Sequence, residues 1–252
     1  MNKKANLLIQ NSSFKIQNSF LHLYIMKLYF KVLGFACLLA IVSCSKNNSE
    51  TTVIDNGYSY FPIDSTKQYL YVVDSISYSN FTTVDTFRFQ LKTQFTNSFI
   101  DLNGTKTWRL QRLAKYKNQD SFREIENHFV QFKNNQMIYT ANNLNFLKAV
   151  FPLNKSTVWN GNLYNTELRV NTKIDLLNEK FTNADTTFTN ALKISEKLSE
   201  DFIFSIEQRS VYQNNKGLVY YKSKNIETQT DQHGVEKKSG FDITQRLVGV
   251  IE

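Results

Sequence analysis

Hydrophobic and polar residues alternate along much of the chain from about residue 58 onward. In one clear case Phe87, Phe89 and Leu91 alternate with charged and amide side chains. A strand that buries one face and exposes the other requires this period of two residues. The same pattern occurs over 69–73, 202–209 and 241–247, and further strand candidates are 105–114, 122–132, 136–140, 166–174, 188–198 and 217–228. The pattern predicts an all-β domain.

Turn residues separate the predicted strands. Asn103-Gly104 and Asn160-Gly161 are expected to supply the positive φ of tight turns, as are residues 214–217 and His233-Gly234. Many strands joined by such turns are typical of an antiparallel sandwich or a partly closed barrel. Residues 190–200 also fit a short helix, because some of their apolar side chains recur every three residues, but a strand is the favoured interpretation.

The only two prolines of the chain stand in similar surroundings, ninety residues apart. Phe61-Pro62-Ile63 is followed by Tyr69, seven residues after the proline, and Phe151-Pro152-Leu153 is followed by Trp159 at the same offset. Proline fixes φ and cannot donate to a ladder, so each motif is expected to precede a strand whose aromatic residue packs inward. The alternatives are two related halves or a coincidence between two short motifs.

An apolar segment near the N-terminus predicts export. The eleven residues 32–42 carry no charge and follow Lys27 and Lys31, which is the pattern of a secretory signal and is too short for a membrane span. Ile41-Val42-Ser43-Cys44 at its end resembles the bacterial lipobox, in which the cysteine is acylated and becomes the first residue. The alternative is an ordinary secreted protein with an incidental Cys44.

These features predict four segments. A signal starting at Met26 has 18 residues, the usual length, so residues 1–25 are interpreted as a mis-called start or an unused extension. Residues 26–43 are the expected lipoprotein signal peptide. The polar residues 44–57 are an expected flexible tether, and 58–252 a single all-β domain.

Cleavage before Cys44 changes the charge and the cysteine content of the protein. Of the 30 Lys and Arg residues 25 follow the signal, together with all 22 acidic residues, so the net charge falls from +8 to +3. Such a charge predicts no nucleic-acid partner. Because Cys37 lies in the discarded segment, the mature chain would keep a single cysteine, which excludes an internal disulfide, thiol catalysis and a zinc–thiolate site.

Several motifs together resemble an uncharacterised family of envelope lipoproteins of the Bacteroidota. They are the Phe-Pro-Ile motif with Tyr69 and Tyr71, the segment from Phe151 to Trp159-Asn160-Gly161, and Gly217-Leu218-Val219-Tyr220. At Asp64-Ser65-Thr66-Lys67 this chain departs from the family, which usually has a glycine turn there. The resemblance implies an all-β architecture and an envelope location, but no chemistry.

One group of residues is a candidate for chemistry. Glu124, Glu126 and His128 would share one face of a strand, and carboxylates with an imidazole can bind a metal or act as an acid–base pair. The favoured interpretation is a solvent-exposed strand face, with Ile125 and Phe129 on the buried side, because metal ligands usually come from several segments. We therefore expect no catalytic residue, no metal and no cofactor.

The sequence thus predicts a non-enzymatic lipoprotein that acts through binding or structural interaction. Cys44 would hold it on the outer membrane. In the lipoproteins that this chain resembles, an acidic run after the cysteine often accompanies export to the cell surface. Ser45-Lys46-Asn47-Asn48 lacks such a run, so the resemblance implies the periplasmic face. The protein or ligand partner is not indicated. The alternatives are a carrier of apolar ligands with an internal cavity and, less favoured, a metal-dependent or glycoside hydrolase.

Overall fold

A computed structural model describes residues 56–79, 81–183 and 186–252. The predictions on the signal peptide, on Cys44 and on nearly all of the tether lie outside these residues. Residues 54–252 form one compact unit, and all the structural features described below belong to it.

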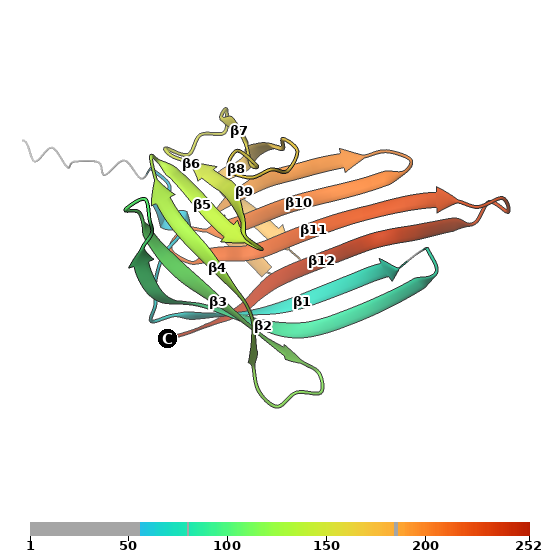
Figure 1. The fold of residues 1–252 in the computed structure, drawn as a ribbon, viewed down its shortest axis with the longest axis horizontal. Helices are drawn as coiled ribbons and strands as arrows, with labels where there is room; N and C mark the ends of the chain where they lie inside the picture. Colours follow the sequence, from blue (N-terminus) through green and yellow to red (C-terminus); the bar gives the residue numbers. More distant parts are fainter. Residues whose placement is uncertain (1–55, 80, 184–185) are drawn as a thin grey trace, which may run out of the picture. The chain divides into compact units, whose positions relative to one another are not determined.

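The described chain is a 3₁₀ turn and twelve antiparallel strands in one sheet (Figure 1). The turn is η1 (Tyr58–Tyr60). The strands of the first half are β1 (Gln68–Ser79), β2 (Thr83–Ile100), β3 (Lys106–Tyr116), β4 (Arg123–Lys133), β5 (Gln136–Ala141) and β6 (Leu144–Val150). Those of the second half are β7 (Val158–Asn160), β8 (Asn171–Asn183), β9 (Thr186–Glu200), β10 (Phe204–Gln213), β11 (Gly217–Thr230) and β12 (Glu236–Ile251).

The strands form a nearly closed barrel. Each pairs with its neighbours in sequence, except that β6 and β7 stand at the two ends of the ladder while β1 pairs with β12. At the seam between β6 and the β7 region, the Leu147 N–H donates to the Gly161 carbonyl at 2.8 Å and Asn145 bridges Tyr164. The predicted all-β class is confirmed, and the form observed is the barrel. Residues 190–200, which also fitted a short helix, are part of strand β9.

The largest core cluster lies where η1 meets the barrel. It joins η1 to strands of both halves, and its buried members are Tyr60, Phe61, Val130, Met137, Leu147, Ala149, Phe151, Trp159, Ile174, Leu192 and Ile194. The Tyr60 hydroxyl also donates to the side-chain oxygen of Asn178 in β8 at 2.6 Å. Tyr69 and Trp159, the aromatic residues predicted to follow the prolines, are both buried and 6% exposed. Whether the two halves arose by duplication stays a prediction.

The hairpin formed by β8 and β9 bends over the opposite face of the sheet. Phe181 of β8 contacts Tyr220 of β11, three strands away in the ladder, with ring centroids 5.5 Å apart. Asn178 and Asn190 adopt φ of 57° and 50° within these strands, where their pairing shifts register. A left-handed asparagine changes the direction of the chain at modest cost, and the bend creates a second, smaller core around Phe188.

Three long hairpins, β1–β2, β9–β10 and β11–β12, extend past the packed end of the barrel, to the right in Figure 1. At the tip of β9–β10, Phe202 is fully exposed, and the strand begins only at Phe204, itself 41% exposed. The alternation over 202–209 predicted a strand with a buried face from its first residue, and for Phe202 this prediction is wrong. Alternation alone does not tell how far a hairpin extends beyond the core.

The predicted turns form, but one of them lacks the expected positive φ. Gly104, Gly217 and Gly234 have positive φ, but Gly161 does not. A Cβ at Gly161 would lie 2.6 Å from the Thr172 hydroxyl, so this glycine permits a close approach to β8. At the first turn, the Asp64 side chain accepts from the Thr66 N–H at 2.9 Å, which replaces the usual glycine with an Asx turn.

Candidate functional site

Two β-bulges place opposite charges on the two sides of the seam. In the pairing of β5 with β6, Met137 lies opposite Ala149 and Ile138 opposite Leu147, which leaves Lys148 as an extra residue. In the pairing of β9 with β10, Glu196 is likewise left without an opposite residue. A bulge redirects the side chain of its extra residue, and both side chains here turn toward each other.

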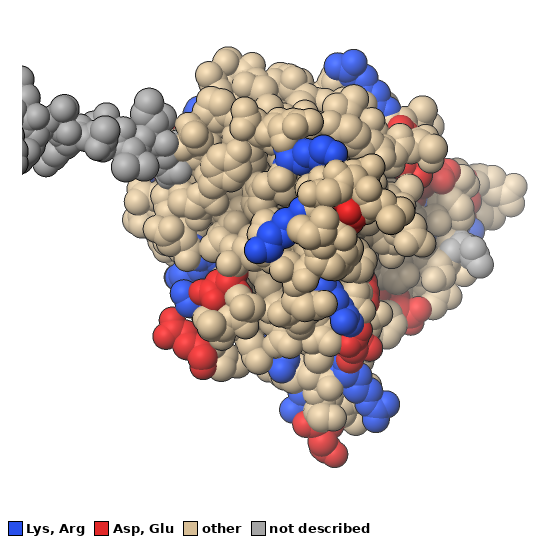
Figure 2. Space-filling view, turned by 60° about the vertical axis from the view of Figure 1, so that its left-hand side comes forward, with Lys and Arg blue, Asp and Glu red and all other residues tan. Residues whose placement is uncertain are grey.

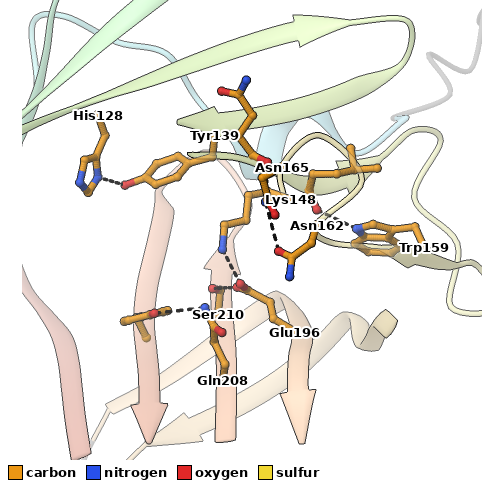
Figure 3. Close-up of polar contacts among 12 residues, drawn as sticks. His128, Tyr139, Lys148, Trp159, Asn162, Asn165, Glu196, Gln208 and Ser210 are labelled. Carbon is orange, nitrogen blue, oxygen red and sulfur yellow. Dashed lines mark hydrogen bonds and ion pairs between the residues drawn. The ribbon is translucent and has the colours of Figure 1, made fainter. Parts of the chain in front are cut away.

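Lys148 and Glu196 form an ion pair across the seam. The Lys148 ammonium group donates to Glu196 Oε2, and the Ser210 hydroxyl of β10 donates to Glu196 Oε1 at 2.5 Å (Figure 3). The two charged side chains are only 14% and 9% exposed. Burial lowers the pKa of Lys148, but the charge and hydrogen bond of Glu196, together with Tyr221, outweigh burial and the net shift is upward. β6 and β9 are not neighbours in the sheet, so this pair joins the β6 end of the ladder to a strand two places in from the β7 end.

Aromatic rings surround the ammonium group. Lys148 Nζ lies 5.9 Å from the ring centre of Tyr139 and 5.6 Å from that of Phe146. Such contacts stabilise a cation that has left water. Burial also raises the pKa of the Tyr139 hydroxyl, which therefore stays neutral and able to donate a hydrogen bond.

A partly open cavity of about 300 Å³ lies beside this ion pair. Its wall comes from β6, from the segment between β7 and β8, and from β8, β9 and β10, and includes Leu144, Phe146, Lys148, Asn162, Glu167, Thr172, Glu196, Lys197 and Gln208. The hydroxyl of Thr172 is buried and has no hydrogen-bond partner among the described residues. The cavity therefore combines apolar walls with amide, hydroxyl and paired charged groups.

The predicted carboxylate–histidine face is split between the two sides of β4. The pairing of β3 with β4 skips Ile125, and this bulge places Glu124 on the face opposite Glu126 and His128. Glu124 accepts from Arg109 at 3.1 Å and from Gln111 at 2.5 Å. The expected shared face is therefore wrong, because an extra residue reverses the alternation.

His128 is buried, and its exposed fraction is 3%. One ring nitrogen contacts Glu126 Oε2 and the other the Tyr139 hydroxyl, while Arg112 lies 3.4 Å from the same Glu126 oxygen. The hydrogen bond with His128 is the main cause that lowers the pKa of Glu126, with burial opposing it. The expectation of a solvated face is wrong for His128, and Ile125, expected on the buried side, is 42% exposed.

His233 does not join this group. His233 lies in the exposed turn between β11 and β12, where its backbone N–H donates to Asp231 Oδ1 at 2.9 Å. In the part of the chain that the structure describes, no three His, Cys, Asp or Glu residues are placed to hold a metal ion.

Sequence reasoning missed Lys148, Glu196 and the cavity. Each residue stands in an ordinary alternating stretch, and only the pairing of neighbouring strands shows that it is the extra residue of a bulge. The predicted turn at Asn160-Gly161 places Gly161 on the cavity wall, which is a weak signal for the site.

Comparisons with known proteins add little. No family model matches the chain, and neither does any curated protein. A solved structure described as a "putative lipoprotein" from Parabacteroides distasonis covers 76% of this chain and 98% of its own, with 12% identity and a TM-score of 0.37. These values carry no functional argument. Among the described residues, no helix is long and apolar enough to cross a membrane.

Proposed function

We propose that this chain is a lipid-anchored envelope protein whose barrel acts by binding rather than by catalysis. The anchor rests on the sequence: a basic start, the uncharged segment 32–42 and the lipobox-like Ile41-Val42-Ser43-Cys44. Two or more acyl chains on Cys44 would hold the protein stably, since each buried methylene contributes ~0.8 kcal/mol. Similar lipoproteins that are exported to the cell surface often carry an acidic run after the cysteine. Ser45-Lys46-Asn47-Asn48 has no acidic residue, which favours the periplasmic face of the outer membrane.

The proposed binding role rests on the cavity beside the Lys148–Glu196 pair. A small pocket with apolar walls and a few fixed polar groups is the usual form of a ligand site. The pair is held in place by Ser210 and by two bulges, which gives the site a defined geometry.

The interior acid–base groups are engaged with one another, which favours binding over catalysis. Both ring nitrogens of His128 contact protein groups, and both carboxylate oxygens of Glu196 accept hydrogen bonds. A general base must instead reach the proton that it removes from a substrate. The charged and amide groups on the cavity wall also give no support to a carrier of apolar ligands.

The surface charge favours a partner other than nucleic acid. On the face that Figure 2 shows, blue and red side chains are interspersed and neither forms a continuous stripe. A protein that binds a phosphate backbone needs a clustered basic surface.

Cell fractionation of Cys44→Ser tests the anchor. The unchanged protein is expected in the membrane fraction after a high-salt wash, and the variant in the soluble fraction, because it cannot be acylated. Sedimentation of both with membranes would refute the lipid anchor. Protease added to intact cells tests the leaflet: digestion of the domain would refute the periplasmic face and leave the anchor standing.

A further inference from the structure

We propose that the seam cavity binds a small, uncharged, hydroxyl-rich molecule, of the class of monosaccharides and disaccharides. This inference rests on the proposed binding function and names its ligand class. It follows from the volume of the cavity, the balance of charge on its wall and the kinds of polar group there.

The volume limits the ligand to a small molecule. Ligand sites commonly have volumes of about 300–1,000 Å³, and this cavity, at about 300 Å³, lies at the lower end. The cavity lies beside the seam between β6 and β7 and is partly open to the surface, so a small ligand can reach it. Asn162, on its wall, is fixed by donating to the Leu168 carbonyl at 2.6 Å.

The wall offers no uncompensated buried charge. Lys148 and Glu196 neutralise each other, and Ser210 takes the second carboxylate oxygen. The remaining charges on the wall, Glu167 and Lys197, are exposed and of opposite sign. An ionic ligand would lose its water without gaining an unpaired counter-charge, which is costly. The site therefore favours a neutral ligand.

The uncharged polar groups suit hydroxyls. Gln208 donates to the Tyr221 hydroxyl at 3.4 Å, which leaves its amide oxygen and one amide hydrogen for a ligand. Asn162 donates to Leu168 and accepts from Asn165, and it keeps one amide hydrogen. The Lys148 ammonium group has three donors, of which Glu196 takes one. A hydroxyl also donates and accepts, so a ring with several hydroxyls can satisfy such a mixed set. Phe146 and Leu144 give apolar surfaces for the C–H faces of the same ring.

The test uses the full-length protein, purified in detergent, and saturation-transfer NMR. Its neutral probes are glucose, galactose, mannose, N-acetylglucosamine, maltose and cellobiose, and its charged probes are glutamate, lysine, glucuronate and citrate. At least one neutral probe is expected to bind saturably, to raise the melting temperature, and to keep its affinity in 0.5 M NaCl. Binding of charged probes alone, or of no probe, would overturn the proposal.

Variants then place the ligand in the cavity. Gln208→Leu should weaken binding by about five- to tenfold, as expected for the loss of one or two hydrogen bonds, and Phe146→Leu should weaken it as well. Lys155→Gln and Glu179→Gln each break an exposed ion pair that lies outside the cavity wall, so the affinity should stay within about twofold. If these two control variants weaken binding as much as Gln208→Leu does, the ligand does not bind in the cavity.

Recovery of the bound probe separates this proposal from the proposed function. A ligand returned chemically unchanged after long incubation agrees with both. A cleaved disaccharide would refute a purely binding role and keep the cavity as the site. If wild type, Gln208→Leu and Phe146→Leu bind the probe equally well, the cavity is not the binding site, and the proposed lipid anchor is unaffected.

Discussion

The phenyl rings of Phe61 and Phe151 meet edge to face, with centroids 5.8 Å apart and planes at 86°. Each ring belongs to one of the two Phe-Pro motifs. Phe61 precedes β1 and Phe151 precedes β7, so their contact joins the starts of two six-strand meanders. Both side chains are buried, with exposed fractions of 5% and 4%. The two halves of the barrel thus meet at this aromatic contact.

Truncation of either ring should destabilise the whole domain. Phe61→Ala and Phe151→Ala are each expected to lower the free energy of unfolding by about 3–5 kcal/mol, the usual cost of removing a buried aromatic ring. The double variant should lose about 0.5–1.5 kcal/mol less than the sum, because the rings contact each other. Denaturant unfolding of the four proteins measures this coupling.

Phe202→Ala is the matched control for these truncations. This ring is fully exposed at the β9–β10 tip, so its loss should leave the free energy of unfolding within about 0.5 kcal/mol of wild type. If Phe151→Ala is as mild as Phe202→Ala, the two motifs do not share a core.

Breaking the ion pair across the seam should cost more than replacing it. Lys148→Met leaves Glu196 buried beside Ser210 alone, and Glu196→Leu leaves the ammonium group without its carboxylate. Each single variant is expected to lose about 3–5 kcal/mol of unfolding free energy. The double variant should recover most of this loss, since two apolar side chains need no partner. Thermal and denaturant unfolding compare the four proteins, and a double variant as unstable as the sum would show that the charges do not act as a pair.

Two buried threonines should respond oppositely to the same substitution. The Thr172 hydroxyl has no partner among the described residues, so Thr172→Val should be neutral or raise the unfolding free energy by up to about 1 kcal/mol. The Thr107 hydroxyl accepts from Gln131 at 2.7 Å and donates to the Thr105 carbonyl at 3.3 Å, so Thr107→Val removes both hydrogen bonds and should cost about 1–3 kcal/mol. A loss of more than 1 kcal/mol in Thr172→Val would mean that its hydroxyl is satisfied in solution.

The part of this structure that the sequence predicts is the two-residue alternation of its strands. Alternation at Tyr69 and the proline ahead of Trp159 were enough to predict buried strand residues, because sidedness and φ are local properties. The bulges were not predictable, since an extra residue is defined only by the strand opposite it. A bulge at Ile125 therefore separated Glu124 from His128, and those at Lys148 and Glu196 formed the candidate site.

Contacts with residues distant in sequence also decide the turn at Gly161 and the exposure of the β9–β10 hairpin tip. Gly161 is a glycine because Thr172, distant in sequence, lies against it, and Phe202 is exposed because its hairpin extends past the core. Neither cause is visible in the residues that surround these positions.

Acid should reveal the Glu126–His128 contact. The folded-state pKa of Glu126 lies below its ordinary value of 4.5, mainly through the hydrogen bond with His128 and with help from Arg112. A lowered pKa means that the ionised group stabilises the fold above pH 4.5, and that this contribution is lost as the pH falls through the folded-state pKa. The difference in unfolding free energy between wild type and Glu126→Gln should therefore be largest near neutral pH and shrink below pH 4.5.

Glu124→Gln is the control from the other face of the same strand. The pKa of Glu124 is also lowered, first by the Asn127 and then by the Gln111 hydrogen bond, but its ion-pair partner Arg109 is 35% exposed, whereas the side chain of His128 is 4% exposed. Water and salt weaken exposed contacts, so the Glu124→Gln difference should be smaller and should fall further in 1 M NaCl. Equal pH profiles for the two variants, with equal salt sensitivity, would show that the buried imidazole adds nothing to the ionised state of Glu126.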